Sequence, residues 1–378
     1  MNLTQRTDIP SPCYVLIEEQ LERNLQLMQH VQTESGVKII LALKGFSMWS
    51  TFKQIRGYLH GATASSVWEA KLAKFEMGGE VHAYSPAYKD ADMQELVNLV
   101  DHLSFNSIGQ WLRHKAATDA AGISVGLRVN PENQEAETPL YDPCAPGSRL
   151  GIRAEQLRGV DLTGIDGFHV HNLCECDSFA TERTLKAIEE KFSPWLGQLK
   201  WLNLGGGHLM TREGYNVEHL IATLKAFKAK YPHLEVIMEP GSAVAWDTGP
   251  LIAEVVDIVE NQDKIAILDI SATAHMPDVL EMPYRPRILN AGMPGDKPYA
   301  YKLGGNSCLA GDVIDIYTFD APLAIGDRLQ FEDMMHYTMV KTTFFNGVEH
   351  PTIAILRKDG TLDVVRQFSY EDFKGRLS

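Results

Sequence analysis

The chain has 378 residues, of which 44% are hydrophobic and 22% are charged, and its formal net charge at pH 7 is −14. This composition is typical of a folded, soluble protein of one large or two smaller domains and excludes a disordered chain. No run of about 18 apolar residues is present, which excludes a membrane span, and the acidic charge argues against nucleic acid and favours a cationic small-molecule ligand.

Through the first part of the chain, apolar runs typical of strands alternate with patterns typical of helices. Eight runs predict strands, at residues 37–44, 60–66, 80–86, 101–107, 123–130, 166–172, 201–207 and 235–241. Amphipathic patterns predict helices between them, at residues 65–78, 90–100, 109–120, 181–192 and 216–231. This alternation predicts an α/β fold, a TIM-type (β/α)8 barrel that we place at residues 21–245. The alternative is a doubly wound open sheet.

After residue 249 the pattern changes to short strand-like runs separated by Gly, Pro and Asp turns. These runs lie at residues 252–259, 264–271, 298–303, 312–319, 327–332 and 352–357. They predict a second, β-rich domain over residues 246–378. The run SPCYVLIE, ahead of the barrel, also predicts a strand, and we expect residues 1–20 to join the β-rich domain.

In (β/α)8 barrels the functional residues lie at the carboxyl ends of the strands, so the last residues of each run are the candidates. The first run, VKIILALK, ends in Lys44. A lysine that closes an apolar strand is partly desolvated, which lowers its pKa, and a neutral amine can attack a carbonyl to form a Schiff base. The alternative is an ordinary solvated lysine at a strand end.

The sixth run ends in His169, Val170, His171 and Asn172. Alternate strand residues share a face, so both histidines project to the same side. Such a pair suits zinc, with Cys174, Glu175 and Cys176 nearby, but no other strand end supplies an evident third ligand. The alternative is a pair of hydrogen-bonded core histidines, and we expect no metal.

The last two strand runs of the barrel end in motifs that suit an anion and a cation. Gly205, Gly206 and Gly207 lack Cβ atoms, so their backbone N–H groups can approach a phosphate, and the alternative is a flexible turn. Glu239, in MEPGS, needs a cationic partner such as a protonated ring nitrogen, and the alternative is an ion pair with Arg128. The lysine, histidine, glycines and glutamate together fit pyridoxal 5′-phosphate, which carries an aldehyde, a flat ring, a phosphate and a ring nitrogen.

These motifs resemble the pyridoxal-phosphate decarboxylases of the alanine-racemase-like barrel fold, and the resemblance covers essentially the whole chain. It implies that Lys44, in LALKGFS, holds the cofactor covalently and that His171, in GFHVHNLCE, stacks on the ring. It also implies that the three glycines bind the phosphate and that Glu239 pairs with the pyridine nitrogen. Within the family the chain is most similar to enzymes that decarboxylate carboxynorspermidine and carboxyspermidine in polyamine biosynthesis.

The resemblance assigns further residues in the β-rich domain. GGNSCLAGD is similar to the segment that each subunit of a homodimer lends to its partner's site, which implies a role for Cys308 as a proton donor and for Asp312 in substrate binding. FEDMMHYT implies that Tyr337 lies near the phosphate. The turn ATAHMPDVLE follows a strand where the family selects its substrate, which makes Asp278 and His275 candidates for the distal amines, with Glu281 as a neighbour.

One departure from the family bears on the substrate. The larger decarboxylases have Arg directly after E-P-G, whereas this chain has Ser242, which we expect to line the substrate site. The serine and the acidic turn argue against the alternative of a diaminopimelate or other basic amino-acid decarboxylase. Two alternatives of a different class are a non-enzymatic pyridoxal-phosphate carrier and a zinc hydrolase on a barrel. The N-terminus lacks an apolar signal core and the five cysteines are irregularly spaced, so we expect a cytoplasmic protein with reduced thiols.

Overall fold

The computed structural model describes residues 1–136 and 138–378. The chain divides into two compact units, one formed by Arg23–Val244 and the other by Met1–Glu22 together with Ala245–Ser378. We call them the barrel unit and the sheet unit and describe each by itself.

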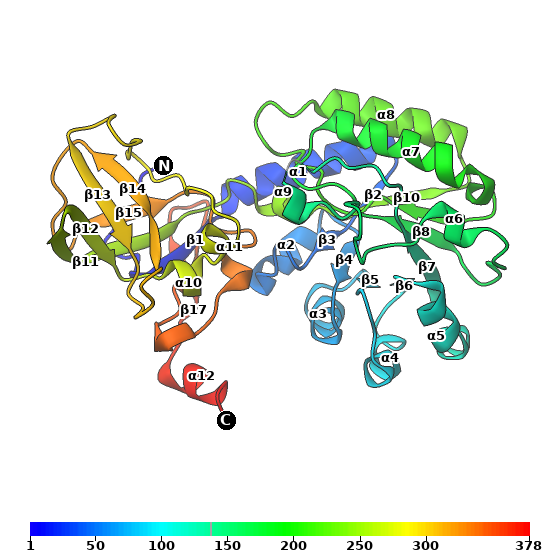
Figure 1. Cartoon of the computed structure of the whole chain (residues 1–378), viewed down its shortest axis with the longest axis horizontal. Helices are drawn as coiled ribbons and strands as arrows, with labels where there is room; N and C mark the ends of the chain where they lie inside the picture. The colour runs from blue at the N-terminus through cyan, green and yellow to red at the C-terminus, as the bar shows by residue number, and fades with distance from the viewer. Residues whose placement is uncertain (137) are drawn as a thin grey trace. The chain divides into compact units, whose positions relative to one another are not determined.

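The barrel unit contains a parallel sheet with the strand order β2-β10-β9-β8-β7-β6-β5-β4-β3 (Figure 1). Its strands are β2 (Lys38–Ile39), β3 (Leu41–Ala42), β4 (Gly61–Ala64), β5 (Glu80–Tyr84), β6 (His102–Phe105), β7 (Ser124–Val129), β8 (Gly167–Val170), β9 (Trp201–Asn203) and β10 (Glu235–Met238). β2 and β3 are two halves of one run around Ile40, and they pair with β10 and β4 respectively. The sheet therefore closes on itself, which confirms the predicted barrel and excludes the open sheet.

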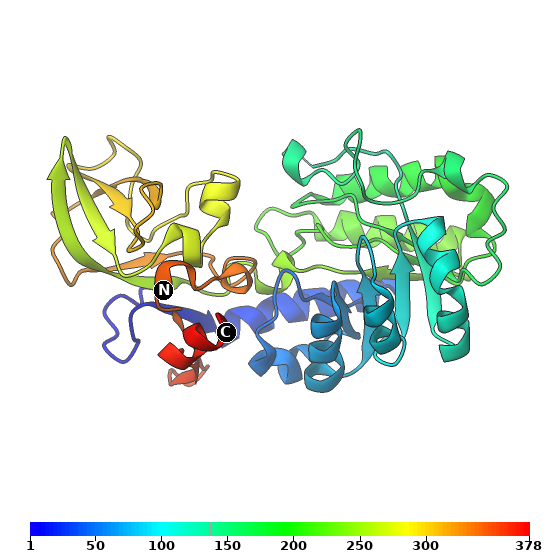
Figure 2. The same ribbon diagram turned by 60° about the horizontal axis from the view of Figure 1, so that its bottom comes forward.

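Helices lie outside the barrel strands, as Figure 1 shows and as the turned view of Figure 2 confirms. They are α1 (Glu18–Ser35, beginning in the sheet unit), α2 (Phe52–Arg56), α3 (Val67–Leu72), α4 (Asp90–Leu96), α5 (Ile108–Ala121), α6 (Ala154–Leu157), α7 (Ser178–Leu196), α8 (Val217–Lys230) and α9 (Ser242–Ala245). Ser66, Ser107 and Asp177 begin α3, α5 and α7 by accepting a backbone N–H at the first turn. Among the described residues, no helix has the length and apolarity needed to cross a membrane.

Trp201 fills the inside of the barrel near the amino ends of the strands. A Cβ atom at Gly126 would lie 2.2 Å from the Trp201 ring, and one at Gly167 would lie 2.0 Å from it. The two glycines on β7 and β8 therefore make room for the indole, which packs with Ile40 and Ile237 in a buried cluster. This packed layer leaves the opposite, carboxyl ends of the strands to carry polar side chains.

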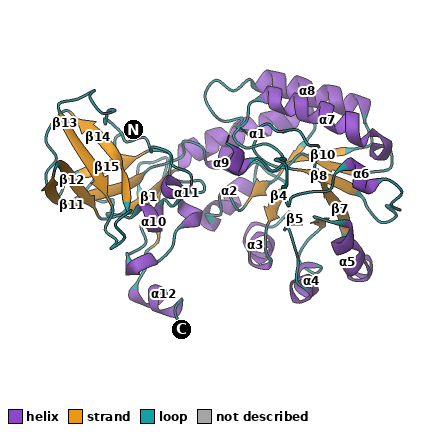
Figure 3. Cartoon of the chain, viewed as in Figure 1, coloured by secondary structure: helices purple, strands orange, loops and turns teal. Residues whose placement is uncertain are grey.

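The sheet unit contains a mixed sheet in the order β14-β13-β12-β11-β1-β16-β17, with β15 paired to β11 (Figure 3). Its strands are β1 (Cys13–Ile17), β11 (Leu251–Asn261), β12 (Asp263–Leu268), β13 (Tyr299–Gly304), β14 (Val313–Phe319), β15 (Arg328–Phe331), β16 (Thr352–Leu356) and β17 (Leu362–Arg366). Short helices accompany them: α10 (Ala272–His275), α11 (Asp278–Glu281) and α12 (Tyr370–Gly375). β1 lies between β11 and β16, so the start of the chain is part of this sheet.

Candidate active site

The barrel topology brings four of the predicted residues to one end of the sheet. Lys44 follows β3, His171 follows β8, Gly205 follows β9 and Glu239 follows β10. Because all barrel strands are parallel, their carboxyl ends meet at the same rim. The contacts described below confirm that Lys44, His171, the glycines and Glu239 are neighbours there.

Lys44 contacts the imidazole of His171, with 3.3 Å between Nζ and Nε2. On the other side of the ring, Nδ1 accepts the backbone N–H of Gly206 at 2.8 Å. A neutral imidazole whose Nδ1 accepts must carry its hydrogen on Nε2, which then can donate to the lone pair of an uncharged amine. The arrangement therefore favours a neutral Lys44, the form in which a lysine is a nucleophile.

The electrostatics around Lys44 act in the same direction. The side chain of Lys44 reaches solvent, but protein closely surrounds its amine. Desolvation is the larger cause that lowers the pKa of Lys44, and the nearby guanidinium of Arg128 lowers it further. Arg128 is buried, donates to the backbone oxygen of His171 at 2.8 Å and lies 4.6 Å from the ring centre of Tyr84. Burial also lowers the pKa of His171 well below its usual value. The lysine and histidine are thus both held toward their uncharged forms.

Glu239 is buried yet remains a carboxylate. Burial alone would raise its pKa, but the contacts with His169 and Asn203 outweigh burial and lower the pKa of Glu239 to about 2. Asn203 Nδ2 donates to Glu239 Oε1 at 2.6 Å, and His169 Nε2 lies 3.4 Å from Oε2. Arg128 instead contacts the backbone oxygen of His171 and the ring of Tyr84. These contacts do not support the alternative of an ion pair between Arg128 and Glu239.

The three glycines stand where no side chain fits. Gly205 and Gly207 adopt φ values of 65° and 90°, in the left-handed region that favours glycine. A Cβ atom on Gly206 would lie 2.6 Å from the Glu239 backbone oxygen. The N–H groups of Gly205 and Gly206 already donate to Asn203 Oδ1 and His171 Nδ1. Because these two N–H groups already have partners, they do not support phosphate binding by this turn, which stays a prediction.

The predicted residues fit pyridoxal phosphate. The amine of Lys44, the flat ring of His171 and the charged carboxylate of Glu239 supply groups that match an aldehyde, a planar ring and a protonated ring nitrogen. The glycine turn packs closely against these residues, because a Cβ atom on any of the three glycines would clash with a neighbouring group. An amine with a lowered pKa near a buried carboxylate suits the covalent attachment of a cofactor.

A metal fits the same residues less well. His169, His171 and Glu239 place potential ligand atoms within 4.8 Å of one another. However, Nδ1 of His171 is occupied by the Gly206 N–H, and its Nε2 faces the amine of Lys44 at 3.3 Å. An ion bound there would have to compete with that amine for the imidazole.

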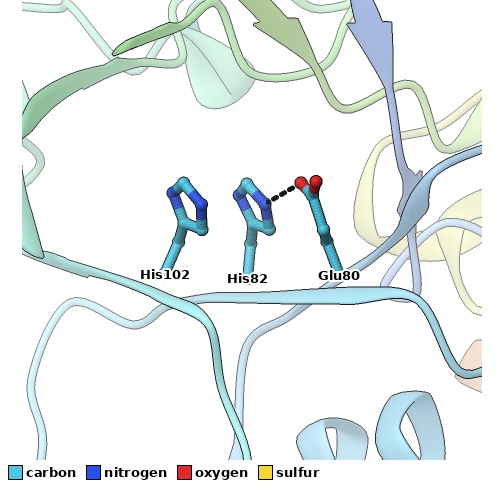
Figure 4. A group of neighbouring side chains, drawn as sticks. All are labelled: Glu80, His82 and His102. Atoms are coloured by element: carbon cyan, nitrogen blue, oxygen red, sulfur yellow. Dashed lines mark hydrogen bonds and ion pairs between the residues drawn. The ribbon is translucent and has the colours of Figure 1, made fainter. Parts of the chain in front are cut away.

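A second group of this kind, Glu80, His82 and His102, lies on β5 and β6 (Figure 4). The two imidazoles are stacked with centroids 4.1 Å apart and planes at 5°, so their in-plane lone pairs do not converge on one ion. Nζ of Lys38 already lies 2.5 Å from Glu80. This geometry favours a stacked, ion-paired core cluster over a metal centre.

Apart from Ser242, the remaining predicted residues lie in the sheet unit, and their relation to the barrel rim stays a prediction. Cys308 is exposed, and its N–H donates to Asn346 Oδ1 at 2.6 Å. Tyr337 has a φ of 49°. Asp278, on α11, contacts the ammonium of Lys341, which also binds Glu281 at 2.7 Å. Ser242 begins α9 in the barrel unit.

Two of the predicted substrate residues have structural partners. Asp312 is buried, and its Oδ1 accepts the N–H of Ala272 at 2.7 Å while its Oδ2 accepts that of Ser307 at 3.2 Å. His275 is fully buried, and its Nδ1 accepts the N–H of Ser271 at 3.2 Å. These contacts give both residues a role in holding the start of α10. Their predicted role in substrate binding stays untested.

Sequence reasoning did not identify the residues that support the site. Asn203 and Tyr84 were not candidates, although both occupy inward positions of their strands beside a predicted site residue. The signal that could have found Asn203 is its place as the last residue of β9, two residues before Gly205. Lys341, the partner of Asp278, left no comparable signal because it lies in a separate segment.

Comparisons with known proteins show what this chain is similar to. Residues 141–335 match the family described as pyridoxal-dependent decarboxylase, C-terminal sheet domain. The chain is 51% identical over 372 residues to carboxyaminopropylagmatine decarboxylase of Synechocystis sp., covering 98% of this chain and 96% of the relative. It is 46% identical over 379 residues to carboxynorspermidine/carboxyspermidine decarboxylase of Campylobacter jejuni, covering 97% of this chain and 98% of the relative. The crystal structure of carboxynorspermidine decarboxylase from Campylobacter jejuni, complexed with norspermidine, matches 97% of this chain and 100% of that chain with a TM-score of 0.91 and 45% identity.

Proposed function

Because this chain belongs to the pyridoxal-dependent decarboxylases, we propose that it decarboxylates carboxynorspermidine to norspermidine and carboxyspermidine to spermidine. The observation that carries the chemistry is the contact between Lys44 and His171 at 3.3 Å, beside a buried and charged Glu239. The observation that carries the substrate class is the 45% identity, over nearly the whole chain, to a structure with bound norspermidine. Membership of this decarboxylase family argues against the two alternatives of a different class, a non-enzymatic carrier and a zinc hydrolase.

A second substrate follows from the relative that is 51% identical, which is named for carboxyaminopropylagmatine. By its name this compound also carries a carboxyl group on an aminopropyl arm, but its far end is a guanidinium rather than an ammonium. Both substrates are cationic amines, which suits a chain of net charge −14. We propose that one site accepts the common carboxylated arm and that the far end decides the preference.

Each residue of the rim has a distinct task in this proposal. Pyridoxal phosphate, when bound, supplies a reactive aldehyde and a ring that accepts electrons as the C–C bond breaks. Lys44 provides the amine that attaches the cofactor, and His171 presents its flat ring to the cofactor's face. Glu239 provides the negative charge for the ring nitrogen. We propose from the family resemblance that Gly205, Gly206, Gly207 and Tyr337 hold the phosphate, which requires the N–H groups of Gly205 and Gly206 to leave Asn203 and His171.

A decarboxylation assay with a substrate panel tests the proposal. Carbon dioxide release is measured with carboxynorspermidine, carboxyspermidine, carboxyaminopropylagmatine and diaminopimelate. We expect activity on the three carboxylated polyamine-type compounds and little on diaminopimelate, since its distal carboxylate would face the acidic turn around Asp278. A preference for diaminopimelate would overturn the proposed substrate class while leaving the family intact.

Replacing Asp278 by asparagine is expected to raise KM for carboxynorspermidine about three- to ten-fold and to change kcat less. Asp278 and Glu281 share a single ammonium, that of Lys341, so the pair retains an excess of negative charge for a substrate amine. Asp320→Asn is the matched control, because Asp320 also pairs with a lysine, Lys297, at 2.6 Å. Equal KM values for D278N, D320N and wild type would show that Asp278 is only a surface acid.

Replacing Cys308 by alanine is expected to lower kcat about a hundred-fold or to give products other than the amine. We propose that Cys308 of the partner subunit in a homodimer returns a proton to the carbon that has lost carbon dioxide. Kinetics and product analysis by mass spectrometry check this, with Cys144→Ala as a control at a buried cysteine of the barrel unit. An unchanged rate with a single product would remove Cys308 from the mechanism. The homodimer and the cytoplasmic location remain predictions.

A further inference from the structure

His169 is a buried histidine that the proposed function does not use. It lies on β8, where its register partners are Arg128 on β7 and Asn203 on β9. Residues in register on parallel strands point to the same side, so these three form one inward layer of the barrel. Glu239 follows β10, whose residue Ile237 is in register with Asn203, and its side chain therefore reaches the same layer.

The contacts of His169 single out Glu239 as its polar neighbour. Nε2 of His169 lies 3.4 Å from Glu239 Oε2 without the alignment of a hydrogen bond, while Asn203 donates to the other oxygen, Oε1, at 2.6 Å. The edge of the His169 ring packs against Tyr84 with centroids 5.1 Å apart and planes at 78°. His169 is 2% exposed, so water does not replace these contacts. Each oxygen of the carboxylate thus faces one side chain, Asn203 from the adjacent strand β9 and His169 from β8 beyond it.

The charge state of His169 decides what it can do for Glu239. Burial lowers the pKa of His169, against the opposing effect of Glu239, and Arg128 and Lys44 lower it further. A neutral imidazole has one N–H, and Glu239 is the carboxylate that the described residues place beside it, 3.4 Å from Nε2. A neutral donor stabilises the carboxylate without cancelling its charge. The full negative charge stays available for a cation at the rim.

We propose that His169 is a positioning residue that donates its Nε2 hydrogen to Glu239 Oε2 and so holds the carboxylate charged and aimed at the ring nitrogen of pyridoxal phosphate. The inference rests on the proposed function, since it takes Glu239 as the partner of that nitrogen. A histidine that only fills space beside Tyr84 would act on the fold and on all ligands equally. The two roles therefore differ in whether His169 discriminates between ligands with and without a ring nitrogen.

The test compares the affinity of the cofactor-free protein for pyridoxal phosphate and for its analogue with a C–H group in place of the ring nitrogen. The dissociation constant of the analogue divided by that of pyridoxal phosphate isolates the contribution of the nitrogen. We expect His169→Phe to lower this ratio about ten-fold, because a lost hydrogen bond to a charged group weakens the pairing. His169→Gln, which retains an N–H donor, is expected to restore most of the ratio. Glu239→Leu is expected to bring the ratio close to one.

The outcomes separate the two levels of the proposal. If Glu239→Leu leaves the ratio unchanged, the assignment of Glu239 in the proposed function is wrong. If Glu239→Leu brings the ratio close to one but His169→Phe lowers the affinity for both ligands equally, or for neither, His169 is only a packing residue. Thermal melts establish that each variant is folded, and His169→Met replaces the phenylalanine variant if that one does not fold. In the double variant of His169 and Glu239 we expect the ratio of Glu239→Leu alone.

Discussion

Replacing Lys44 by alanine is expected to lower kcat/KM for decarboxylation by about three orders of magnitude or more. The variant lacks the amine that lies 3.3 Å from His171, so the cofactor has no covalent attachment at the rim. The purified variant is also expected to lose the visible absorption of the lysine-bound cofactor. Steady-state kinetics and an absorption spectrum after cofactor loading check both results.

Two further lysine variants sharpen this prediction. Lys44→Arg is expected to be as inactive as the alanine variant, because a guanidinium keeps its charge and cannot serve as the nucleophile. Lys200→Ala removes an exposed lysine of the same unit that pairs with Asp166 at 2.7 Å, and it is expected to retain activity. A Lys44→Arg protein that turns over at the wild-type rate would show that charge, rather than a nucleophilic amine, is what position 44 supplies.

Replacing Glu239 by glutamine is expected to lower kcat about a hundred-fold or more, with a smaller effect on KM. Glutamine has nearly the same shape and can keep its contact with Asn203, but it carries no negative charge for a protonated ring nitrogen. Without that charge position 239 would no longer hold a proton on the ring nitrogen of bound pyridoxal phosphate, and the cofactor would supply a weaker electron acceptor. Because the pKa of Glu239 is lowered to about 2, its charge is present above that value and is lost only in strong acid, so the deficit of the variant should persist across neutral pH.

Glu235→Gln is the matched control for this variant. Glu235 begins the same strand, β10, but pairs with Lys38 at 2.8 Å. It therefore tests the removal of a carboxylate from the same strand without touching the rim. We expect Glu235→Gln to leave kcat within about three-fold of wild type. Similar losses in both variants would mean that Glu239 matters for the barrel rather than for the reaction.

The strands of the barrel were predictable because each is specified by its own short apolar run. All eight runs became strands, and the first is only divided at Ile40. The helix α1, Glu18–Ser35, was missed although its signal is present. Leu21, Leu25 and Met28 recur at helical spacing and are fully buried.

That Lys44, His171, Gly205 and Glu239 lie close together was predictable from the ends of the strands, because parallel strands in a barrel place their last residues at one rim. The supporting residues were not, since they depend on register across several strands. Asn203 contacts Glu239, a residue that lies 36 positions further along the chain. Asp278 meets Lys341 across 63 positions, so neither its ion partner nor its effective charge could be read from the turn that contains it.

The measurement that tests the central claim most directly is peptide mapping of the cofactor-loaded protein after borohydride reduction, which makes the bond between lysine and cofactor permanent. The account predicts a pyridoxyl phosphate mass on the peptide that contains Lys44, in a preparation that decarboxylates carboxynorspermidine before reduction. An active preparation that carries the label on another lysine, or on none, would contradict it.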